Sequence, residues 1–336
     1  MNMLKVNILL IIIAFFVFSC DKEEDSVPKS INYISSFSTE KRPHAIAINK
    51  EHGYLYVANH NPSINVYSSK IQKFNSEGIL LKTTVDFTTF DKGNFSRYVP
   101  IDITIDENHN LYILTNPLIK QPDETWTTPT GYCILQFDYN DIFQKEFDLS
   151  NIDWEGFPSS IAYSDNYVFV TNGRIIKRIS IENEQVLNIS LPLNEDTINT
   201  WLDIHTTDMA INSEGTIYLT GQAAFGFDSI GCHITKFDPQ TNKLNTSYSK
   251  GWTWMLYARL NNPGLEISSD GNIYLATFYV MSLELFNGNG EFIMQNDIRI
   301  ENDEEVETRP IDVALNNSLI YIVDYFNNLV LIYEEH

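Results

Sequence analysis

The stretch "SSDGNIYLATF", residues 268–278, contains the unit from which the fold can be inferred. A polar turn ending in Gly271 and Asn272 leads into an aliphatic–aromatic–aliphatic run centred on Tyr274. This aromatic-strand motif recurs five more times, at spacings of 47 to 57 residues, centred on Tyr56, Tyr112, Phe169, Tyr218 and Tyr321. Repeats of this period indicate stacked supersecondary units rather than a single wound core.

A second motif precedes each copy of the first by about one strand and a turn. Its six versions are "RPHAIAI", "VPIDITI", "FPSSIAY", "HTTDMAI", "NPGLEI" and "RPIDVAL", and proline opens five of them. We call it the proline motif. Both motifs alternate apolar with small or polar residues and are bounded by turn residues, which is typical of β-strands.

Two further alternating runs follow in each unit, for example "SINVYSS" (63–69) and "ILLKTTVDF" (79–87) in the first. Four short strands per unit without an amphipathic helix are typical of a propeller blade, and residues 31–336 allow 51 residues for each of six blades. The last unit ends after its third strand, and "SINYISSFS" (30–38) offers the missing fourth. The sequence therefore predicts an all-β, six-bladed β-propeller with four antiparallel strands per blade, closed by an N-terminal strand that covers an open edge.

The order of proline, alternating strand, aromatic strand and outer hairpin resembles the NHL-repeat class of six-bladed propellers over nearly the whole chain after residue 30. The blades are longer than the usual repeat. The Asp that closes the aromatic-strand motif in that class is present only as Asp324, with Asn59, Asn116 and Asn172 in other blades. The resemblance implies an architecture and leaves activity open, because propellers host hydrolases, lyases and binding proteins alike.

The first 30 residues are of a different kind. "MNMLKVNILLIIIAFFVFSC" has one positive charge and an 11-residue apolar run, Ile8–Phe18, which is too short to span a bilayer. Its end resembles a lipobox, so we expect a lipoprotein signal peptide over residues 1–19 and acylation, for instance by palmitate, at Cys20. The alternative is a plain secretory signal that leaves Cys20 an ordinary residue.

Residues 20–30 form an acidic tether that resembles the export signal of some surface lipoproteins of Gram-negative bacteria. Ten extended residues reach at most ~35 Å, so the propeller (31–336) would sit close to the membrane. We therefore expect a lipid anchor in the outer membrane with the propeller exposed at the cell surface. An unremarkable solvated linker is the alternative.

Net charge limits the partners. The whole chain has a formal charge of −22, and removal of residues 1–19 takes away only Lys5, which gives −23. A surface this acidic repels phosphodiester backbones, so nucleic acid is excluded as a natural ligand. Contact with an anionic membrane would have to come from the lipid anchor.

Motifs of catalysis are largely missing from the sequence, which has no HExxH, CxxC, G-x-S-x-G or P-loop. "HTTD" (His205, Asp208) was weighed as part of a metal site or an acid–base pair, and a structural role is favoured for it. A non-catalytic protein is the better interpretation, with no cofactor that the sequence establishes.

Arginine and tryptophan gather near one predicted face. Four of the seven arginines lie within four residues of a blade's opening proline, in loops that enter the innermost strands at the channel mouth: Arg42, Arg97, Arg259 and Arg309. Loops on the same side hold all five tryptophans: Trp126, Trp154, Trp201, Trp252 and Trp254. Exposed aromatic residues with arginine are typical of a recognition surface for protein or carbohydrate, while cover for the core between blades is the alternative.

Aspartates recur at one position of the proline motif in alternate blades, as Asp102, Asp208 and Asp312. These three channel aspartates have three possible roles: partners for the arginines, acceptors for neighbouring backbone N–H groups, or ligands of a calcium or magnesium ion in the central channel.

Three function classes follow. The first is a cell-envelope lipoprotein whose propeller is a binding or scaffold module that recognises its ligand on the arginine/aromatic face. The second is a lactonase- or lyase-like propeller enzyme with a channel metal. The third is an accessory structural component of an outer-membrane nutrient-uptake complex.

Overall fold

The computed structural model describes residues 30–61, 68–90, 97–120, 126–127, 131–152, 154, 157–172, 175–191, 205–224, 230–248, 263–278, 281–300 and 306–336. Within these ranges the chain is built from β-strands and turns and has no helix. Consequently, no helix in the described residues has the length and hydrophobicity needed to cross a membrane.

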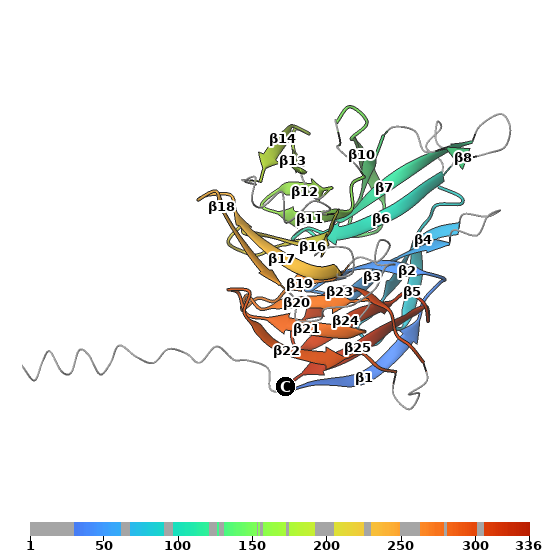
Figure 1. The fold of residues 1–336 in the computed structure, drawn as a ribbon. Coiled ribbons are helices and arrows are strands. Elements are labelled where there is room, and N and C mark those ends of the chain that lie inside the picture. The colour runs from blue at the N-terminus through green and yellow to red at the C-terminus, as the bar shows by residue number, and fades with distance from the viewer. Residues whose placement is uncertain are drawn as a thin grey trace, which may run out of the picture.

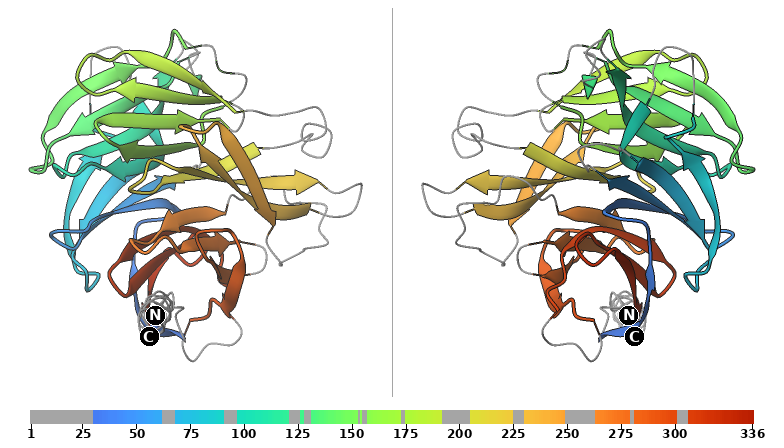
Figure 2. Two further views of the ribbon diagram at one scale, coloured as in Figure 1. Left: turned by 90° about the vertical axis from the view of Figure 1, so that its left-hand side faces the viewer. Right: turned by 90° about the vertical axis from the view of Figure 1, so that its right-hand side faces the viewer.

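Six antiparallel sheets follow one another around a central axis (Figures 1 and 2). Blade 1 contains β2 (Pro43–Asn49), β3 (Tyr54–Asn61), β4 (Ser68–Phe74) and β5 (Leu80–Asp86). Blade 2 contains β6 (Arg97–Ile105), β7 (Leu111–Lys120), β9 (Cys133–Phe137) and β10 (Phe143–Asp148), with the short β8 (Trp126–Thr127) paired to β7. Blade 3 contains β11 (Ser160–Ser164), β12 (Tyr167–Thr171), β13 (Ile175–Ser180) and β14 (Val186–Ser190).

The second half repeats the same order. Blade 4 contains β15 (His205–Ile211), β16 (Ile217–Ala224), β17 (Ile230–Asp238) and β18 (Lys243–Tyr248). Blade 5 contains β19 (Gly264–Ile267), β20 (Ile273–Thr277), β21 (Ser282–Phe286) and β22 (Phe292–Asp297). Blade 6 contains β23 (Pro310–Asn316), β24 (Leu319–Asp324), β25 (Leu329–Glu335) and, as its outer strand, β1 (Ile31–Ser38). The prediction of a six-bladed β-propeller is confirmed.

Strand β1 closes the ring. It pairs antiparallel with β25 from Ile31 opposite Glu335 to Ser38 opposite Leu329, so the two ends of the described chain share one blade (Figure 1). The closing strand predicted at residues 30–38 is therefore confirmed. Its pairing leaves β25 without a free edge.

The aromatic-strand motif supplies the core between blades. The five tyrosines at its centre are at most 1% exposed, and several of their hydroxyl groups reach a polar acceptor at the edge of the core. Tyr112 Oη donates to Asp106 at 3.0 Å, and Tyr321 Oη donates to the Ser76 carbonyl at 3.2 Å. Tyrosine suits this position because its ring fills the interface between sheets while its hydroxyl group keeps a hydrogen-bond partner.

One strand lies elsewhere than the sequence predicted. The third strand of blade 1 was expected at residues 63–69 and is found at Ser68–Phe74. The turn that follows explains the shift, because Asn75 Oδ1 accepts the N–H groups of Glu77 at 3.1 Å and Ile79 at 2.8 Å. Gly78 completes the turn with a φ of +82°, and a Cβ there would meet the Phe37 ring at 2.2 Å. This hairpin ends β4 at Phe74 and pairs it with β5.

Candidate functional site at the channel and its mouth

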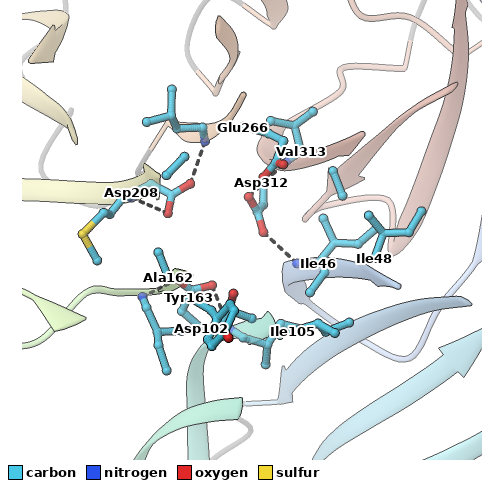
Figure 3. Close-up of a pocket in the computed structure, with 18 of the residues that line it drawn as sticks. Ile46, Ile48, Asp102, Ile105, Ala162, Tyr163, Asp208, Glu266, Asp312 and Val313 are labelled. Carbon is cyan, nitrogen blue, oxygen red and sulfur yellow. Dashed lines mark hydrogen bonds between the residues drawn. The ribbon is translucent and has the colours of Figure 1, made fainter. Parts of the chain in front are cut away.

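The innermost strands of the six blades surround a central channel. Strands β2, β6, β11, β15, β19 and β23 contact one another in ring order and line a cavity of about 210 Å³. Figure 3 shows the carboxyl groups of Asp102, Asp208 and Asp312 around this cavity, with Glu266 beside them. The channel aspartates, separated by more than 100 residues along the chain, thus line one cavity.

Each channel aspartate lies at an irregularity of its strand. The pairing register shifts between Pro100 and Asp102, between Thr206 and Asp208, and between Pro310 and Asp312. A shift of this kind removes the ladder partner of a backbone group. The carboxylate replaces that partner by accepting the N–H of the next residue, at 2.8 Å in Asp102, 2.7 Å in Asp208 and 2.8 Å in Asp312.

The second oxygen of each carboxylate reaches the following blade. Asp102 Oδ2 accepts the N–H of Ile161 at 2.8 Å, and Asp208 Oδ2 accepts that of Leu265 at 2.6 Å. Asp312 Oδ2 accepts the N–H of Ile46 at 2.7 Å. The channel aspartates therefore connect blade 2 to blade 3, blade 4 to blade 5, and blade 6 to blade 1. Of the three roles considered above, acceptance of backbone N–H groups is the one that these hydrogen bonds display.

Burial and mutual repulsion disfavour the charged forms of these groups. Burial raises the pKa of Asp102 to about 6. Burial, and then the charge of Asp102, raise the pKa of Asp208 well above its usual range. For Asp312 burial acts together with the charges of Asp208 and Asp102 in the same direction. The Ser160 hydroxyl group opposes the effect by donating to Asp208 at 2.7 Å.

A divalent cation would relieve this repulsion, so the fit of the carboxylates to such an ion matters. Their oxygens are already used by backbone N–H groups, and in the described part of the chain they are not among the side chains whose ligand atoms all lie within 4.8 Å of one another. A calcium or magnesium ion held by Asp102, Asp208 and Asp312 stays a prediction.

The channel mouth carries arginine stacked on aromatic rings. The Arg309 guanidinium carbon lies 5.3 Å from the centre of the Phe278 ring and 5.8 Å from that of Phe326. Arg42 lies 5.8 Å from the ring of Tyr325, and the Phe326 side chain is 58% exposed. We call Arg42, Phe278, Arg309, Tyr325 and Phe326 the mouth cluster; its members come from blades 1, 5 and 6.

Asp324 organises the loops of this cluster. Its side chain is fully buried and accepts the N–H groups of Arg309 at 3.1 Å and Phe326 at 3.2 Å. One carboxylate thus holds the loop before β23 and the loop after β24 in a fixed relation. It is the acidic residue that sequence comparison with the NHL class singled out in this blade.

The other predicted mouth residues are placed unevenly. Trp154 packs half-buried against the core between blades 2 and 3, with Lys177 Nζ 5.7 Å from its ring. Arg97 begins β6 and Trp126 begins β8, but their side chains lie outside the description. Trp201, Trp252, Trp254 and Arg259 lie outside the described residues, as does Cys20. The structure therefore brings together two of the predicted arginines and places one tryptophan in the core.

Sequence reasoning missed Phe278, Tyr325 and Phe326. All three follow the second strand of their blade, at the end where the first strand begins. The signal available was this position, because antiparallel neighbours place the end of one strand beside the start of the other.

No protein-family model matches the chain, and no curated protein matches its sequence. Solved structures with similar folds include Raptor from Chaetomium thermophilum, with a TM-score of 0.53 and 10% identity. That match covers 91% of this chain and 29% of Raptor, so the chain spans less than a third of that protein. A catalytically inactive variant of virginiamycin B lyase from Staphylococcus aureus, with quinupristin, gives a TM-score of 0.50 at 11% identity.

The lyase match covers 91% of this chain and 99% of the lyase. A protein of unknown function from Bacteroides caccae matches at a TM-score of 0.46 and 11% identity, over 76% of this chain and 81% of that one. At these identities the first two similarities support the propeller fold and carry no activity to this chain.

Proposed function

We propose that the protein is a cell-envelope lipoprotein of the NHL-repeat-like type whose propeller is a binding or scaffold module, with its ligand recognised at the channel mouth. The observation that carries the proposal is the mouth cluster, where two arginines lie over aromatic rings contributed by two blades. Arginine and aromatic residues dominate the energetics of recognition surfaces. The exposed Phe326 ring offers an apolar contact beside the charge.

The charge of the cluster favours an acidic ligand. Among the described residues, the salt bridges pair none of the channel aspartates with Arg42 or Arg309, so the carboxylates in the channel do not neutralise the mouth. Arg309 contacts the exposed Glu307, which a ligand carboxylate can displace. Planar guanidinium groups donate paired hydrogen bonds to carboxylates and sulfates, so an acidic glycan or an acidic peptide is the ligand class proposed.

Replacing both arginines of the cluster should weaken binding of an acidic ligand. We expect Arg42→Ala combined with Arg309→Ala to lower the affinity for an oligogalacturonate or a polyglutamate peptide at least tenfold, since each charge-assisted contact contributes about 1.5–3 kcal/mol. Isothermal titration calorimetry at low salt measures the change. Arg178→Ala and Arg299→Ala are the controls, because Arg178 covers Tyr167 and Arg299 pairs with Asp297 on outer strands. Equal losses in the controls, or unfolding of the double variant, would assign these arginines a structural role.

Membrane attachment depends on residues 1–29, which lie outside the described part of the chain. Cys20→Ser should abolish acylation, because the thiol is the proposed acceptor of the lipid, and should move the protein out of the detergent-extracted membrane fraction. Mass spectrometry of the N-terminal peptide and fractionation measure the two effects. Unchanged membrane partitioning of the variant would contradict the lipoprotein assignment and would leave ligand binding at the mouth untouched.

A second candidate function is a propeller enzyme that uses a metal ion in the channel. The cavity of about 210 Å³ lined by Asp102, Asp208, Asp312 and Glu266 is the observation that favours it, because carboxylates are the ligands that calcium and magnesium prefer. The residues that would hold the ion also accept backbone N–H groups, so the two uses of these carboxylates compete. The Discussion gives the experiment that separates them.

A further inference from the structure

A second cluster of ligating side chains lies at the opposite end of the blades from the mouth cluster. It is formed by Glu51 and His52, in the turn between β2 and β3, and by His109, in the turn between β6 and β7. These turns follow the first strand of each blade, whereas the mouth loops precede it. Blades 1 and 2 are neighbours in the ring, so the two turns meet across one blade interface.

The three side chains converge on one point. Glu51 Oε2 lies 2.8 Å from His109 Nε2, and the ring centres of His52 and His109 are 4.8 Å apart. One ligand atom from each residue lies within 4.8 Å of the other two, and no other group of three such residues in the described ranges meets this condition. Glu51 is 68% exposed and His109 is 21% exposed, so an ion can reach the cluster from solvent.

Both turns are held by their own hydrogen bonds. Asn49 Oδ1 accepts the His52 N–H at 3.1 Å, and the Gly53 N–H donates to the Asn49 carbonyl at 2.8 Å. In the second turn, the Asp106 carbonyl accepts the His109 N–H at 3.0 Å, and Asp106 Oδ1 accepts the N–H of Asn110 at 2.7 Å. The backbone that carries the ligands is thus ordered before any ion binds, which lowers the entropic cost of binding.

We propose that Glu51, His52 and His109 form a binding site for a divalent transition-metal ion, with Zn²⁺ as the reference ion. Two imidazoles and one carboxylate are a ligand set typical of Zn²⁺ and of the neighbouring Ni²⁺ and Cu²⁺, whereas calcium and magnesium take oxygen ligands. Three protein ligands leave a coordination position for water. The exposed Glu51 side chain can withdraw from its contact with His109 so that both ligands bind the ion.

This site is independent of the function proposed above, since it shares no residue with the mouth cluster. It also differs from the predicted channel metal in its donors, which are mainly nitrogen here and oxygen there. His52 lines a surface hollow of about 420 Å³ together with Tyr54, Lys73 and Asp141, which keeps the imidazole next to solvent. The neighbouring Lys50 is engaged with Glu266 at 3.3 Å.

Titration of the purified protein with ZnCl₂, after removal of any polyhistidine tag and of bound metals with a chelator, tests the proposal by calorimetry. We expect one Zn²⁺ per chain at this site. His109→Ala and His52→Ala should each weaken it at least tenfold, and Glu51→Gln should weaken it less because one ligand of three is exchanged for a poorer one. CaCl₂ should not compete for it.

His336→Ala is the matched control, because His336 is also an exposed histidine, 3.6 Å from the carboxylate of Glu334. It should leave Zn²⁺ binding unchanged. Circular dichroism of each variant checks that the turn substitutions leave the strands intact. Absence of Zn²⁺ binding in the wild type, or losses in the control equal to those in His109→Ala, would overturn the proposal.

Discussion

Deleting Ile31–Ser38 is expected to unfold blade 6 and to remove most of the stability of the propeller. The strand β1 pairs with β25 over its whole length, and Ile31, which is 6% exposed, packs in the core of the last blade. Tyr33 contacts Tyr333 with ring centres 5.5 Å apart, and Phe37 contacts Phe74 of blade 1 at 4.7 Å. The strand thus supports both blade 6 and its junction with blade 1.

The expected loss is large compared with the stability of a domain. Burial of one large apolar side chain contributes about 1.5–3 kcal/mol, and each hydrogen bond adds about 0.5–1.5 kcal/mol. The contacts of β1 therefore sum to on the order of 5 kcal/mol or more, against a typical total of about 5–15 kcal/mol. The deletion also exposes β25 as an unpaired edge, so aggregation should accompany the loss. Urea denaturation followed by tyrosine and tryptophan fluorescence measures it.

A deletion of residues 21–29 is the control, because it shortens the chain by a similar length and leaves β1 intact. It should leave the urea midpoint unchanged. If the variant without Ile31–Ser38 unfolds at the same urea concentration as the wild type, the ring does not depend on closure by β1.

Most of the fold could be predicted from the sequence because the blades repeat. The turn before Tyr274 and the alternation around it recur with nearly constant spacing, and each copy forms the second strand of a blade. The prediction failed where a strand was set by a specific turn: Asn75 and Gly78 determine where β4 ends, and alternation alone could not show this.

The candidate site was predictable in part. Alternate blades gave the channel aspartates, but their hydrogen bonds depend on strand irregularities that residue types do not encode. The metal-binding cluster was missed because His52 and His109 are 57 residues apart. That separation is close to the 56-residue spacing of Tyr56 and Tyr112, so aligning the repeats would have placed both histidines in the same turn of neighbouring blades.

Replacing Asp312 with alanine is expected to destabilise the protein more at about pH 5 than at about pH 8. The substitution leaves the N–H groups of Ile46 and Val313 without their acceptor, and both lie in the buried channel wall. A buried N–H group without a partner costs about 1–3 kcal/mol, so the loss should be roughly 2–5 kcal/mol. It acts at any pH, since a protonated carboxyl group still accepts hydrogen bonds.

The pH dependence comes from the charge of the same group. Burial and the charges of Asp208 and Asp102 raise the pKa of Asp312 above the value of about 3.9 that an unfolded chain has. A raised pKa means that the folded state binds its proton more tightly, so the wild type loses stability as the pH rises from the unfolded pKa through the folded pKa. Alanine removes this penalty together with the hydrogen bonds. The destabilisation is therefore partly offset at about pH 8 and fully visible at about pH 5.

Comparison of two proteins at each pH isolates this effect. Buried His44 and His60 have lowered pKa values, His60 about 4, and so reduce stability as the pH falls below about 6.5 in both proteins alike. Asp297→Ala is the control, because Asp297 is 59% exposed on an outer strand; its effect should be near zero at both pH values.

A cation in the channel predicts the opposite result. Carboxylates that bind calcium or magnesium must be ionised, so the ion would stabilise the wild type most at the higher pH and only when it is present. The cost of Asp312→Ala would then be larger at about pH 8 than at about pH 5, and a chelator would reduce it. Urea denaturation of both proteins at the two pH values, with and without chelator, therefore assigns the channel aspartates either to the backbone N–H groups that they accept or to a metal ion.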